Sequence, residues 1–251
     1  MDLSPGDISL IVTGIAWLFA GFVVIVTGMG GPLLALPLMA PFVELPTIIL
    51  VACFVSVPSD ILVTIRFFKY IDWKKAWLLS IGSLPGVWAG VLVLKHVPLF
   101  WMQLGLGVLL LVFLAWQLLA SEEGASEDWD SRAGLLACGA ASGFFNGSVG
   151  LAGPPLAVCA WKCNWDKDTA RGVFGFVFVV AVAATVVLDL WHGLVTETVW
   201  WHILVALPAM LIGMAAGLPA SKRISQALFR RVLLLVVLAG ALTLLYKALL
   251  V

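Results

Sequence analysis

Eight long apolar runs, separated by few charges, constrain the fold of this chain more than any other feature. A helix needs about 20 apolar residues to cross the hydrocarbon core of a bilayer. Charged residues make up 11% of the chain, against about 25% in a soluble globular domain, and the mean hydropathy is +1.12. The sequence therefore excludes an ordinary soluble protein and predicts an all-α polytopic membrane protein. The runs span residues 8–43, 45–65, 76–94, 98–120, 133–161, 172–190, 199–220 and 232–250.

Two of these runs are too long for one crossing, and glycine and proline interrupt each of them. The interruptions lie at residues 27–32 and 146–155. Glycine adds backbone freedom, whereas proline removes a hydrogen-bond donor and clashes with the preceding turn, so both interrupt helices. Each long run is therefore predicted to form a broken or re-entrant helix pair.

The two interruptions are copies of one motif in a tandem repeat. An offset of 122 residues superposes the two breaks, and an offset of 123 aligns the later helices. The sequence thus predicts a first repeat at residues 1–120, an acidic linker at 121–131 and a second repeat at 132–251. The matched pairs are Gly21 and Gly143, Phe22 and Phe144, Gly28 and Gly150, Gly31 and Gly153, Pro32 and Pro154, Leu34 and Leu156, Ala35 and Ala157, Trp77 and Trp200, Leu84 and Leu207, Pro85 and Pro208, and Gly90 and Gly213.

Basic residues cluster at loops that do not correspond between the repeats. Arg66, Lys69, Lys74 and Lys75 follow the second run, whereas the corresponding loop at residues 189–197 has no lysine or arginine. Basic loops stay in the cytoplasm, so the halves are expected to insert in opposite directions, each with about five membrane elements. Two inverted-topology repeats of this kind are typical of secondary transporters. We expect a multi-pass protein of the plasma membrane, the inner membrane of a bacterium.

Small residues recur at a spacing of four in one helix of each repeat. Such stripes let helices approach closely in a membrane, and close packing is a stronger expectation here than a role in transport motion. The stripes are Gly82, Gly86 and Gly90, and Ala209, Gly213 and Gly217.

The two breaks also predict a binding site for an anion. Pro32 and Pro154 each stand just before a new apolar run, as prolines do in the first turn of a helix. Free backbone N–H groups and the positive end of the helix dipole attract anions at such a start. The alternative is a pair of glycine-rich kinks needed only for packing. The substrate-binding candidates are Thr27, Gly28, Met29, Gly30, Gly31, Asn146, Gly147, Ser148, Gly150 and Gly153.

Four polar side chains near the breaks are able to donate to the oxygens of an anion. For Thr27 and Ser142 the alternative is a hydrogen bond back to a carbonyl of the same helix. Asn146 and Ser148 lie in the break itself, which favours a role in the site.

Asp60 is the acidic residue that stands out within an apolar run. Ser56, Asp60 and Thr64 follow each other at a spacing of four, and an ionisable group within a membrane is a candidate for function. We expect Asp60 and Ser56 to take part in proton coupling; the alternative is a structural acid paired with Arg66, Arg171 or a helix start. Arg171 is a gating candidate at the cytoplasmic mouth or, alternatively, an arginine that snorkels to the interface.

The motif at residues 20–37, its copy at 143–155 and the turn at 69–73 resemble the sulfite exporter TauE/SafE family. The resemblance implies a membrane transporter of sulfite, sulfonates such as sulfoacetate, or related small organic anions. It places the glycines of the family's motif on Gly28, Gly30, Gly31, Gly150 and Gly153, with Pro37 as the later proline. The chain departs from that motif at Pro32, Ala152 and Pro154.

Other classes of function are less favoured by the residues. A net charge of zero gives no basic face for nucleic acid. The four cysteines lie within apolar runs, where packing is a better expectation than a metal site, and no cofactor is predicted. An anion channel stays open, as does an intramembrane hydrolase that pairs Ser148 with His192 or His202. The expected partners are a small anion, the lipid bilayer, protons for coupling, and a second copy of the chain in a homodimer.

Overall fold

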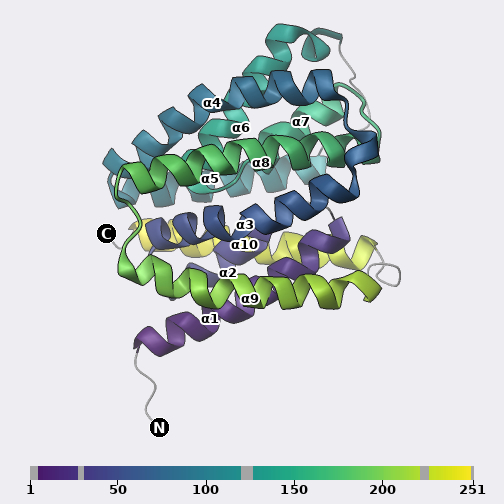
Figure 1. Cartoon of the computed structure of the whole chain (residues 1–251). Helices are drawn as coiled ribbons and strands as arrows, with labels where there is room; N and C mark the ends of the chain where they lie inside the picture. The colour runs from purple at the N-terminus through teal and green to yellow at the C-terminus, as the bar shows by residue number, and fades with distance from the viewer. Residues whose placement is uncertain (1–4, 28–30, 120–126, 221–225, 250–251) are drawn as a thin grey trace. The chain divides into compact units, whose positions relative to one another are not determined.

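The computed structural model describes residues 5–27, 31–119, 127–220 and 226–249, and all the elements in these ranges are helices (Figure 1). This confirms the prediction of an all-α chain. The elements in order are α1 Pro5–Thr27, α2 Gly31–Met39, α3 Leu45–Arg66, η1 Phe68–Tyr70, α4 Trp73–His96, α5 Leu99–Leu119, η2 Glu127–Asp130, α6 Arg132–Val149, α7 Gly153–Lys162, α8 Lys167–Trp191, α9 Glu197–Ala220 and α10 Gln226–Leu249.

Five of the described helices are long and apolar enough to cross a membrane. They belong to α1, α3, α4, α8 and α9, and their most apolar windows have mean hydropathies between 1.8 and 2.6. Shorter apolar stretches lie in α5, at Leu99–Ala115, and in α10, at Leu238–Leu249. The chain is therefore a multi-pass membrane protein, as the apolar runs predict. The short helices α2 and α7 each follow one of the predicted breaks.

The chain packs into two compact units, and each unit takes helices from both halves of the sequence. The first unit consists of residues 1–55, 97–120 and 195–251, and the second of residues 56–96 and 121–194. The first contains α1, α2, α5, α9 and α10 with the beginning of α3. The second contains the end of α3 with α4, α6, α7 and α8. Sequence halves and packed units are thus different divisions of this chain.

In the second unit, α4 and α6 run in the same direction in backbone contact. A Cβ atom added at Gly82 would overlap the carbonyl of Leu136, and one added at Gly90 would overlap that of Phe144. Because both residue numbers rise together, the two helices are parallel. Gly86 in α4, and Gly139, Gly143 and Gly147 in α6, are equally close to the partner backbone. The glycines of α4 therefore serve close helix packing, as expected.

The third parallel helix of this unit is α8. Val87 and Val91 of α4 form a buried apolar cluster with Ala181 of α8. The ring of Trp73, the first residue of α4, makes an edge-to-face contact with that of Phe176 in the third turn of α8, with centroids 5.3 Å apart. Helices α4 and α8 are neighbours in this unit, and their ribbons come close at one end in Figure 1. The starts of α4, α6 and α8 therefore share one end of the unit.

A side chain caps each of these three helix starts. Asp72 accepts hydrogen bonds from the backbone N–H groups of Lys74 and Lys75 in α4. Ser131 accepts from the N–H of Gly134 in α6 at 3.1 Å. Asp166 accepts from the first-turn N–H groups of α8, and hydrogen bonds from Thr169 lower the pKa of its exposed carboxyl group. Each cap satisfies backbone donors that a helix start leaves without intrahelical partners.

In the first unit, α1 and α9 form the corresponding parallel pair. A Cβ atom at Gly21 would overlap the carbonyl of Met210, and one at Gly213 would overlap that of Leu18. Near the start of both helices, Thr13 Oγ1 lies 2.8 Å from His202 Nδ1, and both side chains are buried. Helix α10 packs against α5 and α2 in the same unit.

Candidate functional site

The second predicted break begins where α6 ends at Gly150. This glycine has a φ of 70°, in the left-handed region that residues with a side chain rarely adopt. Its N–H donates to the Asn146 carbonyl at 2.9 Å, and the N–H of Leu151 donates to the Phe145 carbonyl at 3.1 Å. The bond from Gly150 to the carbonyl four residues earlier is that of the αL motif, which closes the end of a helix. Gly150 therefore stops α6 and turns the chain.

Helix α7 begins at Gly153, three residues after Gly150. Its capping residue, Ala152, supplies no side-chain hydrogen bond. An α-helix leaves its first four N–H groups without intrahelical partners, but Pro154 and Pro155 have no N–H at all. The start of α7 therefore presents the N–H groups of Ala152 and Gly153, together with the positive end of the helix dipole.

Two serines near this break donate hydrogen bonds to backbone carbonyls. Ser142 Oγ donates to the carbonyl of Ala152 at 2.9 Å, so it ties α6 to the start of α7 instead of bonding back to its own helix. Ser148 Oγ donates to the carbonyl of Phe144 at 2.6 Å, one turn earlier in α6. Both residues are buried. Ser142 thus holds the geometry of the break, and the Ser148 hydroxyl proton is used within its own helix.

Asn146 connects the end of α6 to α8. Its Nδ2 donates to Thr185 Oγ1 at 2.7 Å, and Thr185 donates in turn to the carbonyl of Ala181 at 2.9 Å. Asn146 and Thr185 are 3% and 0% exposed. This buried hydrogen bond fixes the register of α6 against α8. It lies four residues before Gly150, where α6 ends.

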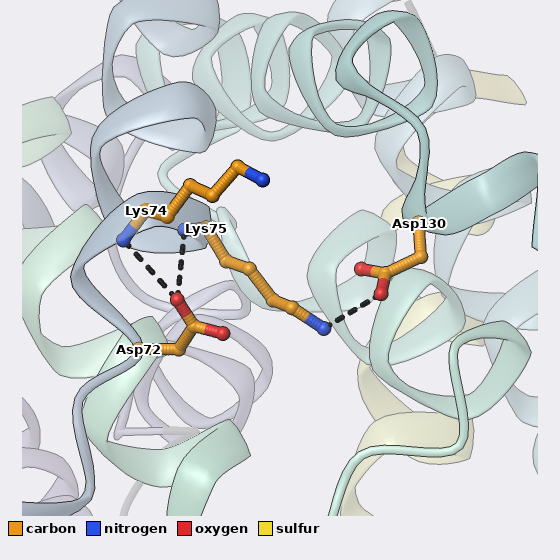
Figure 2. A network of polar contacts seen from close by, with 4 residues as sticks. All are labelled: Asp72, Lys74, Lys75 and Asp130. Carbon is orange, nitrogen blue, oxygen red and sulfur yellow. Dashed lines mark hydrogen bonds and ion pairs between the residues drawn. The ribbon is translucent and has the colours of Figure 1, made fainter.

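The chain after the break returns to the end of the unit where α6 starts. Lys75, near the start of α4, donates from Nζ to Asp130 Oδ2 at 2.8 Å, just before α6 (Figure 2). The same Nζ lies 5.0 Å from the centroid of the Trp165 ring, which follows α7. The thiols of Cys138 in α6 and Cys159 in α7 also lie next to each other. The segment formed by α6 and α7 therefore enters and leaves at the same end of its unit.

The first break lies only partly within the described residues. Gly28, Met29 and Gly30 lie outside the described residues, as does the side chain of Thr27. Gly31, the first residue of α2, is buried, and a Cβ atom there would lie 2.7 Å from Val24 Cγ2. At Gly153, by contrast, a Cβ atom would meet no other atom within 4 Å. Gly147, the remaining candidate, packs against α4.

The coupling candidates Asp60 and Ser56 lie in the part of α3 that belongs to the second unit. Asp60 is half-buried and Ser56 is buried. Thr64 donates to the backbone carbonyl of Asp60 at 2.7 Å and lies against Gly175 of α8. Within the described ranges, no ion pair links the Asp60 carboxylate to Arg66 or Arg171. Those two arginines therefore do not account for an acid at this position.

Arg171 lies in the first turns of α8, away from the break. Its Nη1 is 3.4 Å from Asp168 Oδ1, and its guanidinium lies 5.5 Å from the centroid of the Phe67 ring. Thr185, which marks the level of Asn146, follows 14 residues later, or about 21 Å along the helix at ~1.5 Å per residue. The structure thus places Arg171 at the end of the unit where α8 starts.

Two comparisons with known proteins place this chain among known sequences. The model of the sulfite exporter TauE/SafE family matches residues 13–244. The chain belongs to the sulfite exporter TauE/SafE family. It is 27% identical over 167 residues to the probable sulfite/organosulfonate exporter TauE of Cupriavidus necator. That match covers 65% of this chain and 64% of the relative, which is just under two thirds of its length. No solved structure matches the chain.

The polar groups that suggested a hydrolase have other partners in this TauE/SafE family member. Ser148 donates to a backbone carbonyl, as described above. His192 Nδ1 lies 3.3 Å from Lys95 Nζ. Thr13 donates to the carbonyl of Ser9, so His202 Nδ1 must be the donor in its contact with Thr13. None of these contacts is the serine–histidine pair that nucleophilic catalysis requires.

Sequence reasoning missed a second acid within a spanning helix. Asp189 of α8 is 0% exposed, and neither of its carboxyl oxygens has a hydrogen-bond partner among the described residues. In the sequence, Asp189 begins the stretch 189–197 that corresponds to the basic loop of the first repeat, and it was not singled out there. Its spacing of four from Thr185 is the signal that places both residues on one face of α8.

Proposed function

We propose that this TauE/SafE family member is a secondary transporter that moves small sulfur-containing anions across the bacterial inner membrane. Membership of an exporter family and several spanning helices support transport. The name of the relative from Cupriavidus necator supports sulfite or organosulfonates as the substrate class. A transporter also gives broken helices a purpose, because irregular backbone within a membrane is stable only where protein buries it or where it lines a cavity.

The observation that carries the proposal is the break between α6 and α7. A glycine cap ends α6, and α7 then starts without a side-chain cap. The N–H groups of Ala152 and Gly153 and the positive end of the α7 dipole are suited to the negative oxygens of a sulfonate or sulfite. The open space at Gly153 leaves room for such a group. The Asn146 amide and Ser148 lie at the level where α6 ends, and we assign them to the edge of this site.

The break between α1 and α2 is the proposed counterpart of this site. In an inverted repeat, the two breaks are related by a pseudo-two-fold axis and supply two half-sites for one substrate. The order of helices supports this reading, because a long helix, a break and a short helix open each half of the chain. Thr27 to Gly31 is then the stretch that matches residues around the second break.

Proton coupling is the proposed source of energy, and Asp60 is the acid that the sequence nominates for it. A carboxylate near an anion site repels the substrate, whereas a protonated carboxyl group does not. Ser56, one turn before Asp60, is buried in the same unit. Replacing Asp60 by asparagine is a direct check of its part in the pH dependence.

Counterflow in proteoliposomes tests the proposed function. The full chain is reconstituted with an excess of one unlabelled anion inside, and entry of the labelled anion is followed. The panel consists of sulfite, sulfoacetate, sulfate, thiosulfate and small carboxylates. We expect saturable counterflow with sulfite or sulfoacetate and weaker counterflow with carboxylates. Unitary conductance without counterflow would indicate a channel, and the absence of flux with all the anions would contradict the proposal.

A further inference from the structure

Asp189 is the most completely buried acid that the proposed site does not use. It lies on α8, one helical turn after Thr185, and its two oxygens have no hydrogen-bond partner in the described parts of the chain. A buried carboxylate without a partner is strongly unfavourable, whereas the protonated acid loses much less on burial. This arrangement therefore calls for a proton on Asp189.

The register of the helices places Asp189 at the level of the break. Asn146 and Thr185 are hydrogen-bonded across α6 and α8, and the two helices run in the same direction. Gly150 follows Asn146 by four residues, and Asp189 follows Thr185 by four. Equal steps along parallel helices bring Asp189 to the level of Gly150, on the face of α8 that is turned to α6.

The end of α8 adds to the electrostatic penalty on a charged Asp189. Asp189 lies in the last turn of α8, which ends at Trp191, and the negative end of a helix dipole disfavours a carboxylate there. The charged and titratable groups at this end are Lys95 and His96 of α4 and His192 after α8. Lys95 contacts His192, and His96 contacts the Leu92 carbonyl. The last turns of α6 have no titratable residue. The titratable residues of α7 and η1 lie toward the opposite end of the unit, where α8 starts.

We propose that Asp189 binds the proton that is coupled to anion transport at the break between α6 and α7. This inference rests on the proposed function, but it places the coupled proton on Asp189 instead of on Asp60, the acid that the sequence nominates. The proton enters from water at one side, is held on a carboxyl oxygen, and leaves to water at the other side. When the proton has left, the negative charge of Asp189 stands at the level of the anion site and repels the anion. Proton binding and anion binding therefore favour each other.

A proton fits this position better than a metal cation does. A sodium or calcium ion needs several oxygen ligands around it, and the described residues contain no group of three or more acidic, histidine or cysteine side chains able to hold a metal. The hydroxyl of Thr185, one turn away, already accepts from Asn146 and donates to Ala181. A proton needs only the carboxyl group.

Infrared spectroscopy of the purified full chain tests the protonation without any substrate. The C=O stretch of a protonated carboxylic acid is separate from the stretches of an ionised carboxylate. We expect the wild type minus Asp189→Asn difference at neutral pH to show the protonated acid. A carboxylate signal in this difference would overturn the proposal. Asp189→Glu serves as a second variant that keeps the acid, and gel filtration in detergent verifies that both variants fold.

Sulfoacetate binding and counterflow as a function of pH test the coupling. The charge of this probe is constant from mildly acidic to mildly alkaline pH, because its carboxyl group titrates near 4. We expect wild-type affinity to fall about tenfold as pH rises through this range, a typical size for coupled binding. Asp189→Asn should keep the acidic-side affinity throughout. Glu197→Gln is the matched control, because Glu197 is an exposed acid eight residues later and should behave as the wild type.

The outcomes separate this inference from the proposed function. If the wild type transports sulfoacetate but Asp189→Asn retains the pH dependence, the proton site is wrong and the transporter proposal stands. If Asp60→Asn, but not Asp189→Asn, removes the pH dependence, the coupling proton belongs to Asp60. If the wild type transports none of the anions, the proposed function fails, and the infrared difference alone decides whether Asp189 holds a proton.

Discussion

The pairs α4–α6 and α1–α9 both run parallel, but they achieve close contact in different ways. In α4–α6, glycines of both helices meet the partner backbone along three successive turns. In α1–α9, the close approach of α1 to the partner backbone is concentrated at Gly21, the counterpart of Gly143. One turn before and one turn after it, α1 has Trp17 and Ile25 where α6 has glycine, at Gly139 and Gly147. A buried hydrogen bond between Thr13 and His202 is added at the start of α1–α9. One pair is held by backbone proximity, and the other also by side chains.

The contacts that correspond in the two pairs also show how the residues of α4 and α9 align with each other. The corresponding approaches are Gly86 to Ala140 and Phe144, and Gly213 to Leu18 and Phe22. Ala140 follows Leu18 by 122 residues, which is the offset of the breaks, whereas Gly213 follows Gly86 by 127. The sequence alignment of α4 and α9 uses 123, so the packing differs from it by about one helical turn. By its packing partners, Gly213 of α9 therefore corresponds to Gly86 of α4, and not to the Gly90 with which the sequence aligns it.

The largest difference between the two helix pairs is expected when a methyl group is added to a glycine at each contact. Gly143→Ala should destabilise the protein by about 3 kcal/mol or prevent folding, because its Cβ overlaps the Ser83 carbonyl and α6 has no room to shift. Gly21→Ala, which overlaps Met210, should be less damaging because α1 is close to α9 over a shorter length. Thermal unfolding in detergent, followed by tryptophan fluorescence, gives both values.

Gly105→Ala in α5 is the control for these two variants. A Cβ atom there meets no other atom within 4 Å, so the better helix propensity of alanine should stabilise the protein by about 0.5–1 kcal/mol. Equal losses for Gly21→Ala and Gly143→Ala would contradict the distinction between the two pairs.

A smaller loss of stability is expected when the Thr13–His202 hydrogen bond between α1 and α9 is removed. Thr13→Val keeps the shape of the side chain but leaves the buried N–H of His202 without its acceptor, at a cost of about 1–3 kcal/mol. Thr243→Val in α10 is the matched control, because the Thr243 hydroxyl donates to the Ala239 carbonyl of its own helix. We expect that control to stay within about 0.5 kcal/mol of the wild type. A Thr13→Val unfolding temperature equal to the control's would show that the bond contributes nothing.

The sequence predicts the helices and both breaks because these depend on local composition. Apolar runs locate the spanning helices, and glycine and proline locate Gly150 and the start of α7. The arrangement of helices into units depends on long-range packing, which a single sequence does not encode as a readable pattern. The pairing of α4 with α6, for example, is apparent only when Gly86 is seen against Ala140.

The candidate site was predictable at the level of backbone but not of side chains. Asn146 and Gly153 lie on either side of the break, as expected, but the partners of Ser142 and Ser148 depend on distances between α6 and α7. Asp189 was missed because burial at the end of a helix depends on the neighbouring helices. Gly28, Met29 and Gly30 stay predictions, because they lie outside the described residues.

The most direct measurement of the central claim is sulfoacetate counterflow by Gly153→Leu. The new side chain projects into open space, so the fold should persist, but it covers the start of α7 where the anion is proposed to bind. We expect the initial rate to fall at least about tenfold, equivalent to ~1.4 kcal/mol of binding free energy. Gly105→Leu, with equally open surroundings in α5, should transport within about twofold of the wild type. A folded Gly153→Leu protein that transports sulfoacetate at the wild-type rate would contradict an anion site at this break.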